Sequence, residues 1–481
     1  MSPPRPRFEI PHVFVLLTIV IFVSALFTWV IPSGEFDRET KSVDGHERTL
    51  LIPGTFQHID KNFSANAALL GDEVEGKATP VGLQGFLTAV PRGLEEAADI
   101  IFFIFIIGGT FGILQRTGVI IAAIGSLLRK LGSRSTALTV ILMTLLAIGG
   151  STLGMGEEYI PLIPVFMIVS RRLGYDRVYG LALVFVAAEI GFAASTTNPF
   201  TANVAQGIAE IPLSSGLTLR IIFFVCALAI GILYLLRYGA RIKADHSLSV
   251  MGTGGFETDD DEAEDINFTG RHAAILLSSA AIFGFIIYAV QEHGWWMADM
   301  AGGFFLMGIV AFLIARLSLN EAASAFVKGM EEMVVAALVV GFARGISVVL
   351  NDGQVMDTIV HSAAGVLGHV PRYIAAIGML VFQSTLNVLI PSGSGQAAVT
   401  MPLMAPLADI LGITRQTAVF AFTCGDGFSN SIIPTSGVLM AMLSLAKVPY
   451  TKWLKFMMPL FLMLMGLASV FLVIAVAIDY Q

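Results

Sequence analysis

Charged residues are scarce in this chain. Asp, Glu, Lys and Arg make up 13% of its 481 residues, whereas hydrophobic residues make up 55%. A soluble protein of this length would carry about 25% charged residues. The composition therefore predicts a helical protein that crosses the lipid bilayer many times. The net charge of −8 is modest and spread through loops, so it gives no reason to expect a nucleic-acid partner.

Cysteine is nearly absent, and motifs of enzymes are missing. Cys226 and Cys424 both lie in apolar runs, which predicts small buried side chains and no disulfide framework. The sequence contains no HExxH motif and no spacing of Cys or His typical of a metal site. The stretch "SGSG" at 392–395 has no positioned His. We therefore expect no enzyme activity, no catalytic residues and no cofactor.

Long apolar runs, in contrast, are abundant. A membrane-crossing helix needs about 20 apolar residues. The first run lacks a small-residue cleavage site, which favours a retained helix over a signal peptide. Two of the runs, 178–210 and 415–446, are too long for one straight crossing and contain polar breaks. The nine predicted spans are 11–31, 97–115, 178–210, 218–237, 272–291, 298–316, 328–350, 415–446 and 454–477.

Two further apolar regions, 135–171 and 371–411, each have a polar centre rich in Gly or Pro. Arg134 precedes the first region and Arg171 ends it. Because short basic loops favour the cytoplasm, both ends of this region are expected on one side of the membrane. That predicts a re-entrant hairpin with its tip at 149–158, and a second hairpin with its tip at 391–396. Such tips are tolerated at membrane depth where they line a cavity.

The remaining basic residues set the predicted orientation. "RPR" at 5–7 places the N-terminus in the cytoplasm after a first helix within 1–32. Residues 33–90 then form an extracytoplasmic loop, and the linker 238–270 is cytoplasmic. Its acidic run "TDDDEAED" (258–265) is expected to be a solvated spacer. The C-terminus ends outside, on the periplasmic side of a bacterial inner membrane.

The two halves of the chain resemble each other. "PRGLEEA" (91–97) recurs as "VKGMEEM" (327–333), 236 residues later (327 minus 91). "EIGFAASTTNPFT" (189–201) parallels "GDGFSNSIIPTS" (425–436). The predicted repeats are 91–237 and 298–478, joined by the span 271–291. Their predicted directions across the membrane are opposite, and inverted repeats are typical of secondary transporters.

The hairpin tips and helix breaks supply the candidate site. Unwound carbonyls with hydroxyl and amide oxygens suit a monovalent cation, and half-helix N-termini suit a carboxylate. Carboxylates inside a membrane indicate function, as binders of a cation, a proton or a substrate ammonium. Arg344 either binds a carboxylate or snorkels to the outer interface. The candidate substrate- and ion-binding residues are Ser151, Thr152, Gly154, Glu157, Glu158, Ser195, Thr196, Thr197, Asn198, Thr201, Arg344, Asn387, Ser392, Gly393, Ser394, Gln396, Asp426, Ser429, Asn430, Thr435 and Ser436.

Several of these motifs carry a family resemblance. "PSGSGQAAVTMPLMAPLADILGITRQ", "GDGFSNSIIPTSGVLM", "NPFTANVAQGIAEIPLSSG" and "GMGEE" resemble the YfcC branch of the anaerobic C4-dicarboxylate carrier (DcuC-type) family. The resemblance implies an elevator carrier of the ion transporter superfamily, with a scaffold domain that forms a homodimer and a mobile transport domain. It also implies a site built from Ser151, Thr152, Glu157, Thr197, Asn198, Ser392, Ser394, Asn430 and Thr435.

The expected function is therefore secondary transport of a small carboxylate-bearing metabolite, coupled to Na⁺ or H⁺ or run as an exchange. The family name implies C4-dicarboxylates, and relatives in this branch are linked to arginine/ornithine exchange. Glu157, Glu158 and Asp426 favour an amino acid over a pure dicarboxylate. A sodium ion is expected near Thr197, Asn198, Asn430 and Thr435. An arginine/ornithine-type basic amino acid antiporter is the alternative. A channel ranks below it, because a channel has no use for paired hairpin tips.

Overall fold

The computed structural model describes residues 13–43, 46–72, 74–131, 134–256 and 267–481. The basic residues 5–7 and the acidic run 258–265 lie outside this set. Within it, eight helices are long and apolar enough to cross a membrane: Val13–Val30, Ala98–Arg116, Ser135–Leu153, Leu217–Ala244, Gly270–Val290, Met297–Ala315, Val334–Asp352 and Tyr450–Ala477. Seven of them match predicted spans. The eighth, Ser135–Leu153, is the first arm of the first predicted hairpin.

The expectation of an all-α fold is wrong in one region. Residues 33–78 form two small sheets and the short helix α2 (Ala65–Leu69). Strand β4 (Gln57–Lys61) pairs antiparallel with β1 (Ser33–Glu35) and parallel with β5 (Lys77–Ala78), while β2 (Arg38–Val43) pairs antiparallel with β3 (His46–Leu51). These strands are two to six residues long and mostly polar, so they show no hydrophobic periodicity.

Two series of helices follow the same order along the chain. The first series is α3 (Leu83–Glu96), α4 (Ala98–Arg116), α5 (Val119–Leu131), α6 (Ser135–Leu153), α7 (Ile163–Arg172), α8 (Arg177–Ala193), α9 (Ala202–Ile208) and α10 (Leu217–Ala244). The second is α13 (Leu319–Glu332), α14 (Val334–Asp352), α15 (Met356–Leu367), α16 (Arg372–Leu386), α17 (Gly393–Ile410), α18 (Arg415–Asn430), α19 (Gly437–Ala446) and α20 (Tyr450–Ala477). The breaks at Ala97 and Met333 are 236 residues apart (333 minus 97).

The two helix series have different bounds from the predicted repeats. The first series begins at Leu83 and not at 91, and the second begins at Leu319 and not at 298. Two helices, α11 (Gly270–His293) and α12 (Met297–Ala315), lie between the series, where one connecting span was expected. The sequence missed α3 and α13 because charged and apolar residues alternate around them, so neither forms a continuous apolar run.

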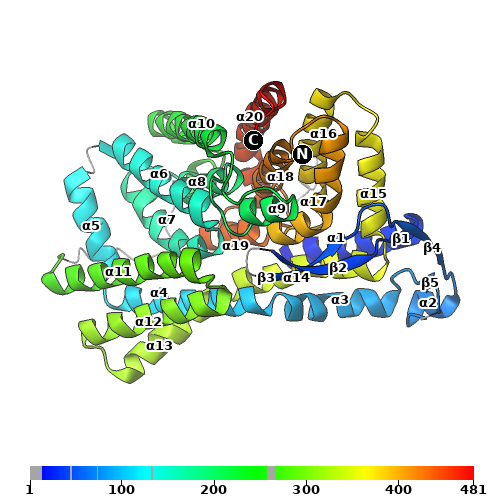
Figure 1. The fold of residues 1–481 in the computed structure, drawn as a ribbon. Coiled ribbons are helices and arrows are strands. Elements are labelled where there is room, and N and C mark those ends of the chain that lie inside the picture. The colour runs from blue at the N-terminus through cyan, green and yellow to red at the C-terminus, as the bar shows by residue number, and fades with distance from the viewer. Residues whose placement is uncertain (1–12, 44–45, 73, 132–133, 257–266) are drawn as a thin grey trace, which may run out of the picture.

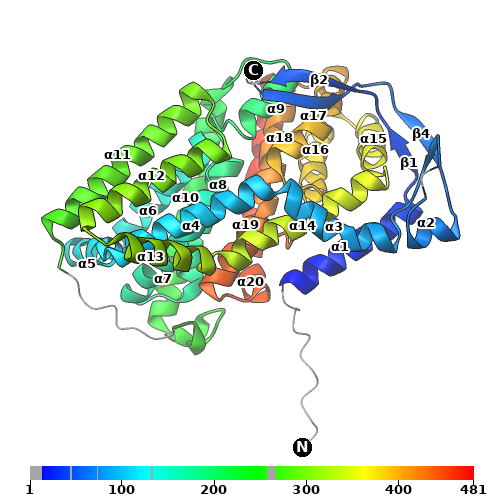
Figure 2. The same ribbon diagram turned by 90° about the horizontal axis from the view of Figure 1, so that it is seen from below.

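Figure 1 shows two layers. A base layer contains α1 (Val13–Val30), α3, α4 and α11–α14, and an upper bundle contains α6–α10 and α16–α20. The connecting helices α5 and α15 stand at opposite ends of the molecule. Seen from below, in Figure 2, the base layer lies in front of the upper bundle.

Small residues allow the two repeats to pack closely in the base layer. A Cβ placed on Gly93 of α3 would lie 2.4 Å from the Gly341 carbonyl oxygen of α14. A Cβ on Gly329 of α13, which occupies the position equivalent to Gly93, would lie 2.2 Å from the Gly108 carbonyl oxygen of α4. Backbone contact through glycine is typical of helices that associate in membranes.

The interrupted helices form the centre of the upper bundle. Nearly every residue of α8 and α18 is buried, and a Cβ on Gly427 of α18 would lie 2.4 Å from the Ala193 Cα at the end of α8. The C-terminal ends of the two helices therefore meet. Each predicted long span is interrupted here: residues 194–201 separate α8 from α9, and residues 431–436 separate α18 from α19.

Each hairpin runs alongside the broken helix of its own repeat. Thr139 and Tyr179 lie 2.7 Å apart through their hydroxyl groups, and at the other end Ser151 Oγ donates to the Ala194 carbonyl at 3.1 Å. Helices α6 and α8 are thus parallel, with α7 returning between them in the chain. The Tyr175 hydroxyl lies 3.3 Å from Ser135 Oγ, so both ends of the first hairpin lie at one end of the bundle.

Candidate functional site

The tip of the first hairpin is attached to the first helix break. The Ser151 carbonyl accepts hydrogen bonds from the Thr196 and Thr197 amides, at 2.9 and 3.3 Å. Helix α6 ends at Gly154, whose φ of +68° lies in the left-handed region. A Cβ at Gly154 would lie 2.3 Å from Asn198 Oδ1, so glycine is required both by its conformation and by this contact. The Asn198–Pro199 pair explains the break, because Pro199 has no amide hydrogen and disfavours helix before it.

The second hairpin is attached to α18, beside the second break, by the Asn387 amide and by Ser384 Oγ, which donates to the Gly425 carbonyl at 3.0 Å. Asn387 is fully buried, and its Nδ2 lies 2.8 Å from each of three acceptors: the Asp426 carbonyl, Ser429 Oγ and Asn430 Oδ1. After this turn, Ser392 caps the returning helix α17, and its Oγ accepts from the Gly395 amide at 3.4 Å.

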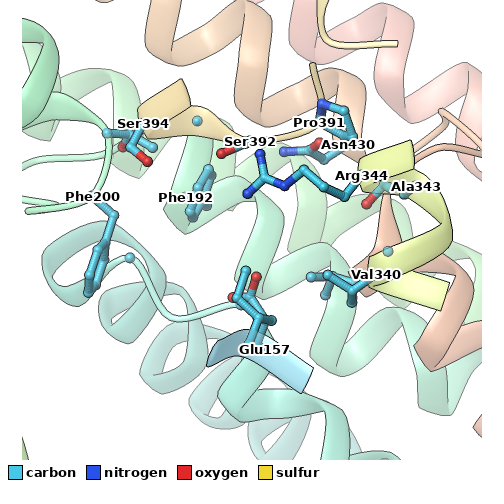
Figure 3. Close-up of a pocket in the computed structure, with 18 of the residues that line it drawn as sticks. Glu157, Phe192, Phe200, Val340, Ala343, Arg344, Pro391, Ser392, Ser394 and Asn430 are labelled. Carbon is cyan, nitrogen blue, oxygen red and sulfur yellow. The ribbon is translucent and has the colours of Figure 1, made fainter. Parts of the chain in front are cut away.

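A cavity of about 230 Å³ lies where these tips meet the base layer. This size suits a small metabolite. The upper bundle contributes both hairpin tips and both breaks, and the base layer contributes the α3–α4 junction, the start of α12 and the middle of α14. Figure 3 shows Arg344 and Glu157 entering this space from different walls, with Ser392 and Asn430 beside the guanidinium group.

The structure places the predicted residues in two groups. Eleven of them line the cavity: Gly154, Glu157, Glu158, Thr201, Arg344, Ser392, Gly393, Ser394, Asn430, Thr435 and Ser436. The other ten are packed behind it: Ser151, Thr152, Ser195, Thr196, Thr197, Asn198, Asn387, Gln396, Asp426 and Ser429. Much of this second group connects a hairpin to its neighbouring break, as Ser151 and Asn387 do. Sequence motifs could not separate wall residues from supporting ones.

The cavity wall is predominantly acidic. Five carboxylic side chains line it, Glu96, Asp99, Glu157, Glu158 and Glu189, against a single basic residue, Arg344. Glu158 Oε2 accepts a hydrogen bond from the Gly156 amide at 2.9 Å. The guanidinium group of Arg344 has no hydrogen bond or ion pair to any other described residue, so its donors are available to a ligand.

One group behind the second tip has the character of a cation site. Asp426 is fully buried, and neither of its carboxylate oxygens has a hydrogen-bond partner among the described residues. Its Oδ2 would lie 3.0 Å from a Cβ on Gly393, next to Thr201, whose buried hydroxyl is also unpaired. Thr435 Oγ1, on the wall of the same cavity, is also buried and unpaired among the described residues. Of the residues predicted to surround sodium, Thr197 donates to the Thr152 carbonyl and Asn198 accepts from the Phe200 amide.

Sequence reasoning missed several residues of the site. Glu96 and Asp99 lie at the edge of an apolar run, where they resemble ordinary flanking charges. Arg220 is 1% exposed in α10, and its Nη1 donates to the Ser195 carbonyl at 3.1 Å and to Thr423 Oγ1 at 3.4 Å. The signal for Arg220 was a basic residue inside a predicted span.

Comparison with known proteins now decides the family. A sequence profile of the C4-dicarboxylate anaerobic carrier (DcuC) family matches residues 10–477. This chain belongs to the DcuC family. As a DcuC-family protein it is a multi-pass membrane protein and a secondary transporter, and it is not an enzyme, as predicted.

Relatives of this DcuC-family chain extend over its whole length. It is 35% identical to the Escherichia coli protein named "Putative basic amino acid antiporter YfcC", with 100% of this chain and 99% of the relative covered. It is 30% identical to an uncharacterized Haemophilus influenzae protein, with 99% of each covered. Among solved structures, the Alcanivorax borkumensis YdaH transporter is similar at 16% identity and a TM-score of 0.48, covering 98% of this chain and 99% of that one.

Proposed function

We propose that this transporter carries an amino acid with a cationic side chain across the bacterial inner membrane, as an exchanger or coupled to an ion. The observation that supports this substrate is the charge of the cavity wall, with five carboxylic side chains and one arginine. A doubly anionic ligand would face this excess of negative charge, whereas a cationic side chain would be attracted to it. The name of the Escherichia coli relative agrees with this substrate class.

A C4-dicarboxylate is the second candidate. Its support is the family description together with Arg344 and the N-terminus of α17, both of which can bind a carboxylate. Among the described wall residues, no further basic side chain could bind the second carboxylate of such a ligand. This is why we rank the dicarboxylate below the basic amino acid.

The proposed mechanism is an elevator movement of the upper bundle against the base layer. The cavity lies between these two layers, so a shift of one against the other would open it to alternate sides. In this proposal both hairpins are re-entrant, the repeats are inverted in the membrane and the base layer forms a homodimer. The N-terminus is then cytoplasmic and the C-terminus periplasmic.

For the coupling ion we propose Asp426, assisted by Thr201 and by Thr435, which was among the four residues first predicted. Its unpaired carboxylate oxygens can bind Na⁺ or a proton, and the helix break beside it frees backbone carbonyls.

The test of substrate class is counterflow into proteoliposomes. Vesicles preloaded with lysine, arginine or ornithine should accumulate the labelled amino acid, and vesicles preloaded with succinate, fumarate or malate should not. Accumulation driven only by the dicarboxylates would overturn the proposed substrate. Ohmic single-channel currents without saturable counterflow would instead show a channel.

A further inference from the structure

The charges around the cavity are divided between the two repeats. All five carboxylic side chains of the wall belong to the first repeat, on α3, α4, the first hairpin tip and α8. Among the described residues of the wall, Arg344 is the only basic side chain, and it belongs to α14 of the second repeat. Within the same set, the second repeat contributes no carboxylic side chain. The cavity thus has an acidic end, formed by the carboxylic side chains of the first repeat, and a basic end, formed by Arg344 of the second.

This division comes from substitutions at equivalent positions. With the 236-residue offset, Asp99 corresponds to Val335 (335 minus 99) and Glu157 corresponds to Gly393 (393 minus 157). Arg344 corresponds to Gly108 (344 minus 108), which contacts Met333 and Gly329 in the base layer and does not reach the cavity. Asp99, Glu157, Glu158, Glu189 and Arg344 therefore have uncharged partners in the other repeat. Glu96 corresponds to Glu332 (332 minus 96), which is charged but does not line the cavity.

The two hairpin tips also differ in charge, with the acidic residues again in the first repeat. After the first tip, the chain continues with Glu157 and Glu158, and the Gly156 amide is already paired with Glu158 Oε2. After the second tip, the 18-residue helix α17 begins with Ser392, Gly393 and Ser394, with no acidic residue in its first turn. The N-terminus of α17 carries partial positive charge and faces the cavity beside Arg344.

The acidic end also contains a buried group without a partner. Glu189 lines the cavity at 7% exposure, and its Oε2 has no hydrogen-bond partner among the described residues. Glu189 lies within electrostatic range of Asp426, behind the second tip, and of Glu157, and Glu157 lies within range of Asp99. An unpaired carboxylate at this depth is costly unless a cation approaches it.

From these observations we infer that the cavity binds its substrate in one orientation. The cationic side-chain end faces Asp99, Glu157 and Glu189 of the first repeat, and the α-carboxylate faces Arg344 and the N-terminus of α17 in the second. This inference rests on the proposed function and assigns each end of the substrate to one repeat. It makes both the side-chain cation and the α-carboxylate of the substrate necessary, so compounds that lack either group bind weakly.

Competition for labelled lysine counterflow tests this orientation. The competitors are norleucine, which lacks only the side-chain ammonium of lysine, and cadaverine, which lacks only its carboxylate. Glu157→Gln should reduce the preference for lysine over norleucine by about tenfold or more and leave the preference over cadaverine nearly unchanged. Arg344→Gln should reduce the preference over cadaverine by a similar factor and leave the preference over norleucine nearly unchanged.

Glu95→Gln is the matched control, because Glu95 is exposed and does not line the cavity. Neither preference should change in it. If a variant fails to insert, Asp99→Asn replaces Glu157→Gln, and Arg344→Lys replaces Arg344→Gln because lysine keeps the charge but loses the two-pronged carboxylate contact.

The outcomes separate the orientation from the proposed function. Wild-type protein that shows no lysine, arginine or ornithine counterflow would refute both. Wild-type counterflow with variants that leave both preferences unchanged, or that exchange their effects, would refute the orientation while the proposed function stands.

Discussion

The attachment of the second hairpin to α18 beside its break gives the sharpest prediction. It centres on buried Asn387, and Ser384 Oγ adds a hydrogen bond to the Gly425 carbonyl at 3.0 Å. Asn387 Nδ2 lies 2.8 Å from three acceptors on α18. Two amide hydrogens can satisfy only two of these at once. Hydrogen bonds between membrane helices contribute about 0.6 kcal/mol on average, and an acceptor left buried and unpaired costs about 1–3 kcal/mol. We therefore expect Asn387→Ala to lower the free energy of unfolding by about 1–3 kcal/mol.

The same substitution should also weaken substrate binding. Asn430 lines the cavity and loses the donor that orients its side chain, so the KM for lysine should rise by about tenfold. Unfolding in mixed micelles and counterflow kinetics measure the two effects. Thr385→Ala is the control, since Thr385 lies two residues away and its exposed hydroxyl bonds only within α16. Equal unfolding free energies and KM values for the two variants would refute this role of Asn387.

Three further predictions concern the breaks, the topology and the ion. Asn198→Ala and Asn430→Ala should each abolish uptake while the protein remains folded and inserted, and proteoliposomes with wild-type rates would contradict this. Cysteines introduced at 134 and 172 should react with an impermeant reagent from the same side of the membrane; labelling from opposite sides would make the first hairpin an ordinary crossing. Asp426→Asn should remove the dependence of uptake on sodium or on pH, measured as initial rates in sodium and choline buffers at two pH values; unchanged ion dependence would exclude Asp426 as the coupling site.

Local patterns account for the parts of the fold that were predicted. The paired polar interruptions near Asn198 and Asn430 identified both helix breaks, because proline together with a cluster of small polar residues disfavours regular helix. Apolar runs identified seven of the crossing helices, since burial in lipid requires about 20 such residues. The sequence did not predict the strands of residues 33–78 or the amphipathic helices α3 and α13. Their formation depends on contacts with distant parts of the chain, such as the ion pair of Arg38 with Asp357 at 2.9 Å.

The sequence by itself determined that this chain is a membrane protein, and it predicted two related halves, each with a hairpin and a broken helix. Composition, length of apolar runs and helix-breaking residues are local properties, and they act whatever the chain packs against. Only the tertiary structure decided which polar residues face the cavity and which support it. Asp99 and Arg344 are 245 positions apart (344 minus 99), and only the packing of α4 and α14 brings them to one cavity. Its charge is thus a property of the folded assembly of helices and cannot be read from any one segment.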